Sequence, residues 1–403
     1  MWIGVAALYE LRLSKLLIAT NEQVLATIET ILLPFILIVV LVSIFVALAP
    51  KRLMWRSPQL IDGSSDQDDL FVFERRLKKW LIIWGVFSIV EVIVSGGVPL
   101  AWLFLGNGKT YFDFGLKSLH GILNSLILAI GVCYTGLFAK YGQKRHLLCF
   151  AFIIAWSVLL VSRSMLIVNI VQGAIVVALH RGIPKSLVVK LAAYGLILIF
   201  GFGVIGDLRS GAQEFRDLAQ PTSDYPEWLP SGVLWVYIYL TTPLNNLIYS
   251  SRTVRPVDDI LFPNTAAPLF PSRIRNIVYG DSLSESLSGD LVDQAFNVST
   301  AYIGPYQDYG LIGIAAFSLF IGLAGARCWS RNQFSDSLVY VVIGQCLLLT
   351  SFYNHFFSLP IITQVLWIRI FFIKGRARKK AARQVDAGNG FYISPGDQPV
   401  VSS

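Results

Sequence analysis

Long apolar runs separated by short polar loops recur along the chain, and this pattern predicts a bundle of membrane-spanning helices. Ten runs are long enough to cross about 30 Å of hydrocarbon. They cover residues 1–20, 29–49, 80–105, 116–139, 146–162, 164–180, 187–206, 301–326, 337–353 and 359–373. The first is the weakest, because Glu10, Arg12 and Lys15 lie in its second half. The alternative is that this segment lies on the membrane surface, which would change the count to nine. The predicted fold class is therefore an all-α, polytopic integral membrane protein.

One polar stretch, residues 207–300, interrupts the runs and is predicted to be a large loop outside the bilayer. Within it, residues 233–250 are nearly long enough to cross, yet a crossing there would export the Arg-rich tail. Pro243, Asn245 and Asn246 favour a re-entrant or interfacial helix instead. The predicted organisation is then seven spans over 1–206, the loop 207–300, three spans over 301–373, and a basic tail over 374–403 with the composition of a disordered end.

Positive charge is concentrated on one predicted face of the bundle. Two thirds of the 33 Lys and Arg residues fall in loops or tail on that face, whereas the short opposite loops hold Lys109, Lys117 and Arg163. Cytoplasmic loops are enriched in Lys and Arg. We therefore predict that both termini are cytoplasmic and that the large loop faces outward. This distribution also explains the net charge of +8, so nucleic acid is not an expected partner.

Composition excludes a soluble domain, because 55% of the residues are hydrophobic, 14% are charged, and the mean hydropathy is +0.61. The four cysteines, in or beside apolar runs, form no C-x-x-C pair. Neither a disulfide framework nor a zinc site is indicated, and no metal or cofactor is expected. Gly201, Gly203 and Gly206 match a dinucleotide-binding pattern, but they end an apolar run, so close helix packing explains them better.

Two arginines are candidates for binding an anion at the outer surface. Arg209 follows Gly206, Asp207 and Leu208 at the outer end of the seventh predicted span. Its guanidinium can clamp a phosphate bidentately, and the alternative is an arginine that snorkels and pairs with Asp207. Arg163 joins the fifth and sixth predicted spans on the poorly basic face, and the alternative is an interface anchor.

The segment Asn297–Gly310, where the chain re-enters the bilayer, is rich in aromatic and polar residues. On a helix, Tyr302, Tyr306 and Tyr309 would share one face, and such faces hold sugar rings. The alternative is an ordinary interfacial tyrosine belt. Asp308, among apolar neighbours, must be either paired or functional.

Two histidines at predicted outer helix ends are candidate general bases. His355 follows Tyr353 and Asn354, and His120 begins the fourth span. A lone interfacial histidine is more often structural, which is the alternative for both. Glu91 lies mid-span and is either functional or paired with a neighbouring helix.

These residues together resemble the bacterial O-antigen polymerases, the Wzy-type oligosaccharide repeat-unit polymerases. The resemblance covers most of the chain, through Leu8–Leu11 with Ser14, Ser95–Leu100, Phe112–Gly121, Gly206–Arg209 and Asn297–Gly310. It implies a bacterial inner-membrane glycosyltransferase, similar to lipid-donor GT-C-like enzymes, that polymerises undecaprenyl-diphosphate-linked units on the periplasmic side without a metal. Its partners would be the lipid-linked glycan donor and acceptor, the lipid bilayer and a chain-length regulator protein.

The resemblance also implies roles for individual residues. Arg163, Arg209 and Arg273 would hold the diphosphate, Asp308 or His355 would be the base, and sugar or other substrate contacts would come from His120, Asn297, Thr300 and Tyr306. An O-antigen ligase shares the outer loop and the donor and stays an alternative. A transporter or flippase of lipid-linked glycans is a second one, but related halves are expected for that class and this sequence shows no internal repeat.

Overall fold

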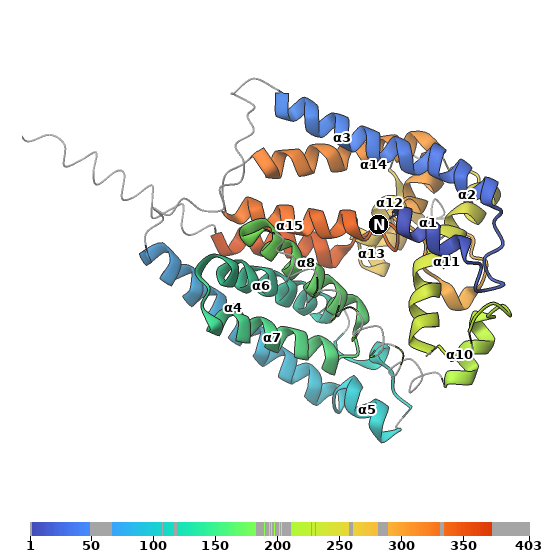
Figure 1. Ribbon diagram of the computed structural model, residues 1–403. Coiled ribbons are helices and arrows are strands. Elements are labelled where there is room, and N and C mark those ends of the chain that lie inside the picture. The colour runs from blue at the N-terminus through green and yellow to red at the C-terminus, as the bar shows by residue number, and fades with distance from the viewer. Residues whose placement is uncertain are drawn as a thin grey trace, which may run out of the picture.

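The computed structural model shows a bundle of long helices with a group of shorter helices gathered at one end (Figure 1). The structure describes residues 2–48, 67–106, 108–116, 119–182, 211–226, 228–229, 231–257, 261–280, 289–330 and 334–372, with single positions between 189 and 203. These residues form no strand, and one isolated bridge joins Ser14 to Pro221. The predicted all-α class is confirmed.

The elements that matter below are, in chain order, α1 (Trp2–Glu10), α2 (Asn21–Thr27), η1 (Ile28–Leu32), α3 (Leu33–Leu48), α4 (Gln67–Ser95), α5 (Pro99–Leu105), η3 (Tyr111–Asp113), α6 (Leu119–Tyr141), α7 (Lys144–Leu159), α8 (Arg163–Arg181), α10 (Ala212–Ala219), α11 (Ser231–Thr253), α12 (Pro263–Ala266), η4 (Ala267–Leu269), α13 (Ser272–Tyr279), η6 (Gln294–Phe296), α14 (Ile303–Ser330) and α15 (Phe334–Leu348). A C-terminal helix follows over Leu359–Phe372.

Five helices of the described chain are long and apolar enough to cross a membrane. They are Asn21–Val46, Phe71–Leu105, Leu119–Tyr141, Arg163–Arg181 and Ile303–Trp329, and two shorter apolar helices cover Phe334–Leu348 and Leu359–Phe372. All seven coincide with predicted spans. The chain is thus a membrane-embedded helical protein. The total number of spans stays a prediction, since residues 187–206 fall mostly outside the described part.

The outer helices of the bundle present apolar side chains to their surroundings. Phe45 of α3 and Ile93 of α4 are more than 70% exposed, whereas α6 is buried along most of its length. Exposed apolar area costs about 25 cal/mol per Å² in water, so these outward faces fit a hydrocarbon environment. Helix α6 forms the centre of the bundle.

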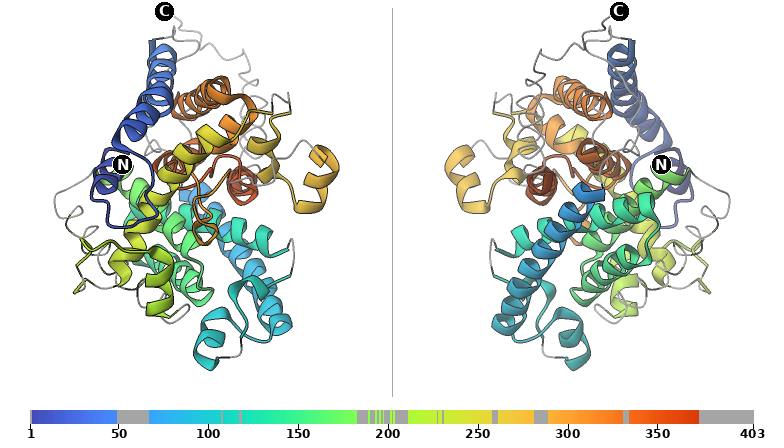
Figure 2. Two further views of the ribbon diagram at one scale, coloured as in Figure 1. Left: turned by 90° about the vertical axis from the view of Figure 1, so that its right-hand side faces the viewer. Right: turned by 90° about the vertical axis from the view of Figure 1, so that its left-hand side faces the viewer.

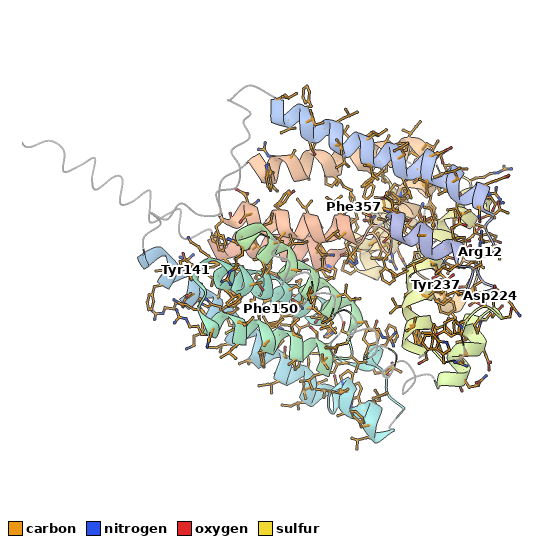
Figure 3. The ribbon with its side chains drawn as sticks, viewed as in Figure 1. Arg12, Tyr141, Phe150, Asp224, Tyr237 and Phe357 are labelled. Atoms are coloured by element: carbon orange, nitrogen blue, oxygen red, sulfur yellow. The ribbon has the colours of Figure 1, made fainter. Side chains whose placement is uncertain are left out.

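The two ends of the bundle differ in content, and Tyr141 marks one of them (Figure 3). Lys144 begins α7 just after Tyr141, and Arg181 donates to the carbonyls of Phe138 and Ala139, so we call this end the basic end. The opposite end, where Arg12, Asp224 and Tyr237 lie, gathers α1 and α10–α13. We call it the loop end.

Residues 1–20 do not form the predicted spanning helix. Helix α1 has nine residues, about 14 Å, or half the hydrocarbon thickness. The chain then turns at Arg12, whose φ is 49°. The Tyr9 hydroxyl donates to Asn245 Oδ1 at 2.6 Å, which fixes this segment on α11. Residues 1–20 therefore do not cross the bilayer as one helix, and they fit the alternative in which this segment lies at the surface, toward the loop end. The side of the membrane on which each terminus lies stays a prediction.

Helix α11 contains the segment predicted to be re-entrant or interfacial. It runs unbroken from Ser231 to Thr253 with Pro243 inside, and it lies across the loop end rather than along the bundle (Figure 2). Gly232, at its start, lies so close to Gly203 that a Cβ at Gly203 would be 2.4 Å from the Gly232 Cα. The arrangement favours the interfacial alternative. It also shows that one of the predicted packing glycines allows a close helix approach.

Candidate functional site

A hollow of about 190 Å³ opens at the loop end, and we call it the loop-end hollow. It is lined by Arg163, Phe215, Leu218, Trp235, Tyr239, Ala295 and Phe296. These residues come from α8, α10, α11 and η6. A span of the bundle and three parts of the outer loop therefore meet around one space.

Aromatic rings form one wall of the loop-end hollow. The Phe215 ring stacks on Trp235 with centroids 3.5 Å apart, and Tyr239 continues the stack at 5.6 Å. Phe296 packs edge-on against Phe215 and Tyr239. Flat aromatic faces beside a phenolic hydroxyl can hold a ring that has one apolar face and polar edges.

Arg163 brings positive charge to this wall. It is the first residue of α8, and its guanidinium lies 5.0 Å from the centroid of the Trp235 ring. A cation over an indole is attracted by the ring quadrupole, which holds the side chain beside the hollow. A guanidinium can bind a phosphate through two parallel hydrogen bonds. Arg163 begins its helix, as its predicted position between two spans implies, and that this end is the outer one stays a prediction.

Asn246 of α11 positions the segment that closes the hollow. Its Nδ2 donates to the carbonyls of Phe296 and Val298, at 3.0 and 2.9 Å, and its Oδ1 accepts from Val292 N at 3.2 Å. These bonds place Phe296 in the wall and leave Asn297 exposed beside it. Asn297 is thus the predicted sugar-contact residue that lies next to the hollow.

The predicted tyrosine face is not presented to a ligand. Tyr302 is fully buried and packs edge-on against Phe35 of α3. The Tyr306 hydroxyl donates to Ser251 O at 2.8 Å, and Tyr309 leaves helical geometry at a kink with Gly310. The prediction of one shared face is wrong, because Tyr302 packs on α3 whereas Tyr309 packs on Phe262 of the loop, and the helix is interrupted at Tyr309 and Gly310. Thr300, 1% exposed, is also buried.

Asp308 forms a buried polar joint between α14 and the outer loop. Its carboxylate accepts from Asn264 N at 2.8 Å, Asn264 Nδ2 at 2.9 Å and Thr265 N at 2.8 Å. The side chain is fully buried. Two of these donors are backbone groups of the first turn of α12, which have no partner within the helix. The acid is therefore paired, and this geometry favours a structural role over that of a base.

His355 lies in the turn between α15 and the C-terminal helix. Its ring packs edge-on against Tyr353, and burial lowers the pKa of His355 to about 4. It is neutral at pH 7 and a weak proton acceptor. Burial raises the pKa of Tyr353, and the charge of Arg275 on α13 opposes that shift.

The remaining predicted residues fall into two groups. Arg209 lies outside the described residues, and so does the side chain of Arg273 on α13. His120 pairs with Glu91, the mid-span acid. Within the described chain, no group of three His, Cys, Asp or Glu side chains could hold a metal ion.

Comparison of the chain with protein-family models, with curated proteins and with solved structures gives no match. The evidence on function is therefore the set of side chains that line the loop-end hollow.

Proposed function

We propose that the chain is a glycosyltransferase that polymerises undecaprenyl-diphosphate-linked oligosaccharide repeat units at its loop end. The observation that carries this proposal is the loop-end hollow, where a guanidinium lies over stacked aromatic rings at the end of a lipid-exposed bundle. A substrate with an isoprenoid tail, a diphosphate and sugars needs these three environments next to one another.

The chemistry divides among these groups. The acceptor hydroxyl oxygen forms a bond to the anomeric carbon of the donor, and the bond from that carbon to the phosphate oxygen breaks. The leaving diphosphate gains negative charge, which Arg163 would stabilise together with Arg209 and Arg273. The aromatic wall and Asn297 would hold the sugars, and the isoprenoid tail would lie along the apolar outer helices.

The orientation of the protein follows from its charge. The basic end faces the cytoplasm, as Lys- and Arg-rich ends do, and the loop end faces outward from a bacterial inner membrane. Diphosphate-linked repeat units would be joined there.

The surface glycan of a strain that lacks this chain tests the function. We expect surface material with a single repeat unit, because unit transfer to the surface continues while polymerisation stops. A ligase would leave no surface glycan at all, and a flippase would also leave lipid-linked units inside the cell. An unchanged ladder of long glycan would contradict all three.

A further inference from the structure

A second polar group at the loop end pairs an intramembrane acid with a histidine. Glu91 near the end of α4 is 1% exposed, and its Oε2 lies 3.2 Å from His120 Nδ1 at the start of α6. The His120 side chain is 25% exposed. One partner is thus sequestered and the other can meet a ligand.

The two ring nitrogens of His120 have different polar neighbours, and from these we infer the tautomer that carries its proton on Nδ1. Asn124 Nδ2 lies 2.9 Å from His120 Nε2. With the amide nitrogen as donor, Nε2 must present its lone pair. Nδ1 then carries the proton and donates to Glu91. A histidine whose Nδ1–H is held by a carboxylate and whose Nε2 is unprotonated is oriented to accept a proton.

The turn before α6 is built around this pair. Leu116 N donates to Glu91 Oε1 at 3.1 Å, and Gly115 N donates to Ser95 Oγ at 2.9 Å. Gly115 has a φ of +85°, and a Cβ there would lie 2.8 Å from both Glu91 Oε1 and the His120 ring. A side chain at this position would displace the pair. Leu116 N and His120 Nδ1 thus hold the two carboxylate oxygens of Glu91 in place.

The register of α6 against α8 places His120 near Arg163. A Cβ at Gly131 would lie 2.9 Å from Asn169 Oδ1, and one at Gly173 would lie 3.7 Å from Thr135 Cγ2. The same difference in residue number separates both pairs, so the helices run parallel. With this register, the Arg163 backbone lies beside a point on α6 that is about five residues, or about 7.5 Å, further along the helix than His120.

The two side chains make different contacts at this end. The His120 imidazole lies against Glu91 of α4, and the Arg163 guanidinium lies over Trp235 of α11. Their backbones lie on neighbouring helices, and packed helices are about 8–10 Å apart. We infer that the two groups contact different parts of one lipid-linked sugar diphosphate.

We propose that His120 Nε2 accepts the proton of the acceptor hydroxyl and that Glu91 is the positioning residue. This inference rests on the proposed function. The hydroxyl replaces the Asn124 amide as the donor to Nε2. As its oxygen bonds to the anomeric carbon, the proton passes to Nε2, and the electron pair of the broken carbon–oxygen bond leaves with the lipid diphosphate.

Membrane vesicles that carry the full chain and the strain's own lipid-linked repeat units test this role. His120→Gln keeps a polar side chain without a base, and we expect polymerisation to fall about 100-fold or more at an unchanged protein level. In His120→Ala, added imidazole should restore part of the activity. A merely structural histidine would not give this rescue. Glu91→Gln should lower activity by less than His120→Gln does.

The outcomes separate the two proposals. Vesicles with the unchanged chain that form no polymer contradict the proposed function. Polymer formation by the unchanged chain and equally by His120→Gln overturns only the role of His120. Loss of activity in His120→Ala without imidazole rescue also overturns it, as does failure of both His120 variants to accumulate as folded protein, since the pair is then structural.

Discussion

Replacing Arg163 by alanine is expected to lower glycan polymerisation by about 10²–10³-fold, the cost of removing one donor that stabilises developing negative charge. The contact of Arg163 with Trp235 contributes about 0.5–1 kcal/mol, and thermal unfolding in detergent checks that the variant keeps its fold. Arg163→Lys keeps the charge but loses the planar fork, so an intermediate activity is expected. The length distribution of surface glycan, with protein level measured alongside, gives the result.

Arg252→Ala is the matched control for Arg163→Ala. Arg252 is exposed in the last turn of α11, also at the loop end, and does not line the loop-end hollow. It should leave polymerisation nearly unchanged. Equal losses in both variants would show a general effect of charge, and a normal ladder of long glycan in Arg163→Ala would remove this arginine from the mechanism.

Replacing Asp308 by alanine is expected to destabilise the protein by about 3 kcal/mol or more. The change leaves Asn264 N, Asn264 Nδ2 and Thr265 N without their acceptor in a buried place, and each orphaned donor costs about 1–3 kcal/mol. Asp308→Asn keeps an acceptor oxygen but not the charge, so a smaller loss is expected. Thermal unfolding in detergent measures the difference, with the exposed Asp224→Ala as control.

The Asp308 variant also separates structure from catalysis. If Asp308→Ala unfolds at a lower temperature and is cleaved by protease near α12, Asp308 holds α14 and the loop together. An Asp308→Ala protein of unchanged stability that no longer polymerises glycan would instead make Asp308 a catalytic residue.

The positions of most spans could be predicted from the sequence because an apolar run of sufficient length has few other uses. Helices α6, α8 and α14 lie where their runs predict them. The predicted span over residues 1–20 does not form, because composition does not reveal where a helix ends, and α1 ends at Glu10. The bond from Tyr9 to Asn245 joins positions far apart in the sequence, and periodicity carries no signal for it.

The site could be predicted only in part, for a related reason. Arg163 could be identified as a candidate because the short loops on the predicted outward face hold few Lys and Arg residues. Its aromatic partners Phe215 and Trp235 were hidden, because a stack forms from two helices whose packing no local pattern specifies. The sequence predicted that Glu91 is either functional or paired with a neighbouring helix. The structure identifies His120 as its partner.

The proposed function requires the loop end to lie outside the inner membrane, since lipid-linked units would be joined there. In a chain without its four cysteines, one thiol is introduced as Asp224→Cys at the loop end and, separately, one as Lys144→Cys at the basic end, both exposed positions. We expect a maleimide that cannot cross the inner membrane to label the Asp224→Cys thiol in intact cells, and the Lys144→Cys thiol only after that membrane is opened. Labelling of the Lys144→Cys thiol in intact cells, with the Asp224→Cys thiol protected, would rule out polymerisation at the loop end.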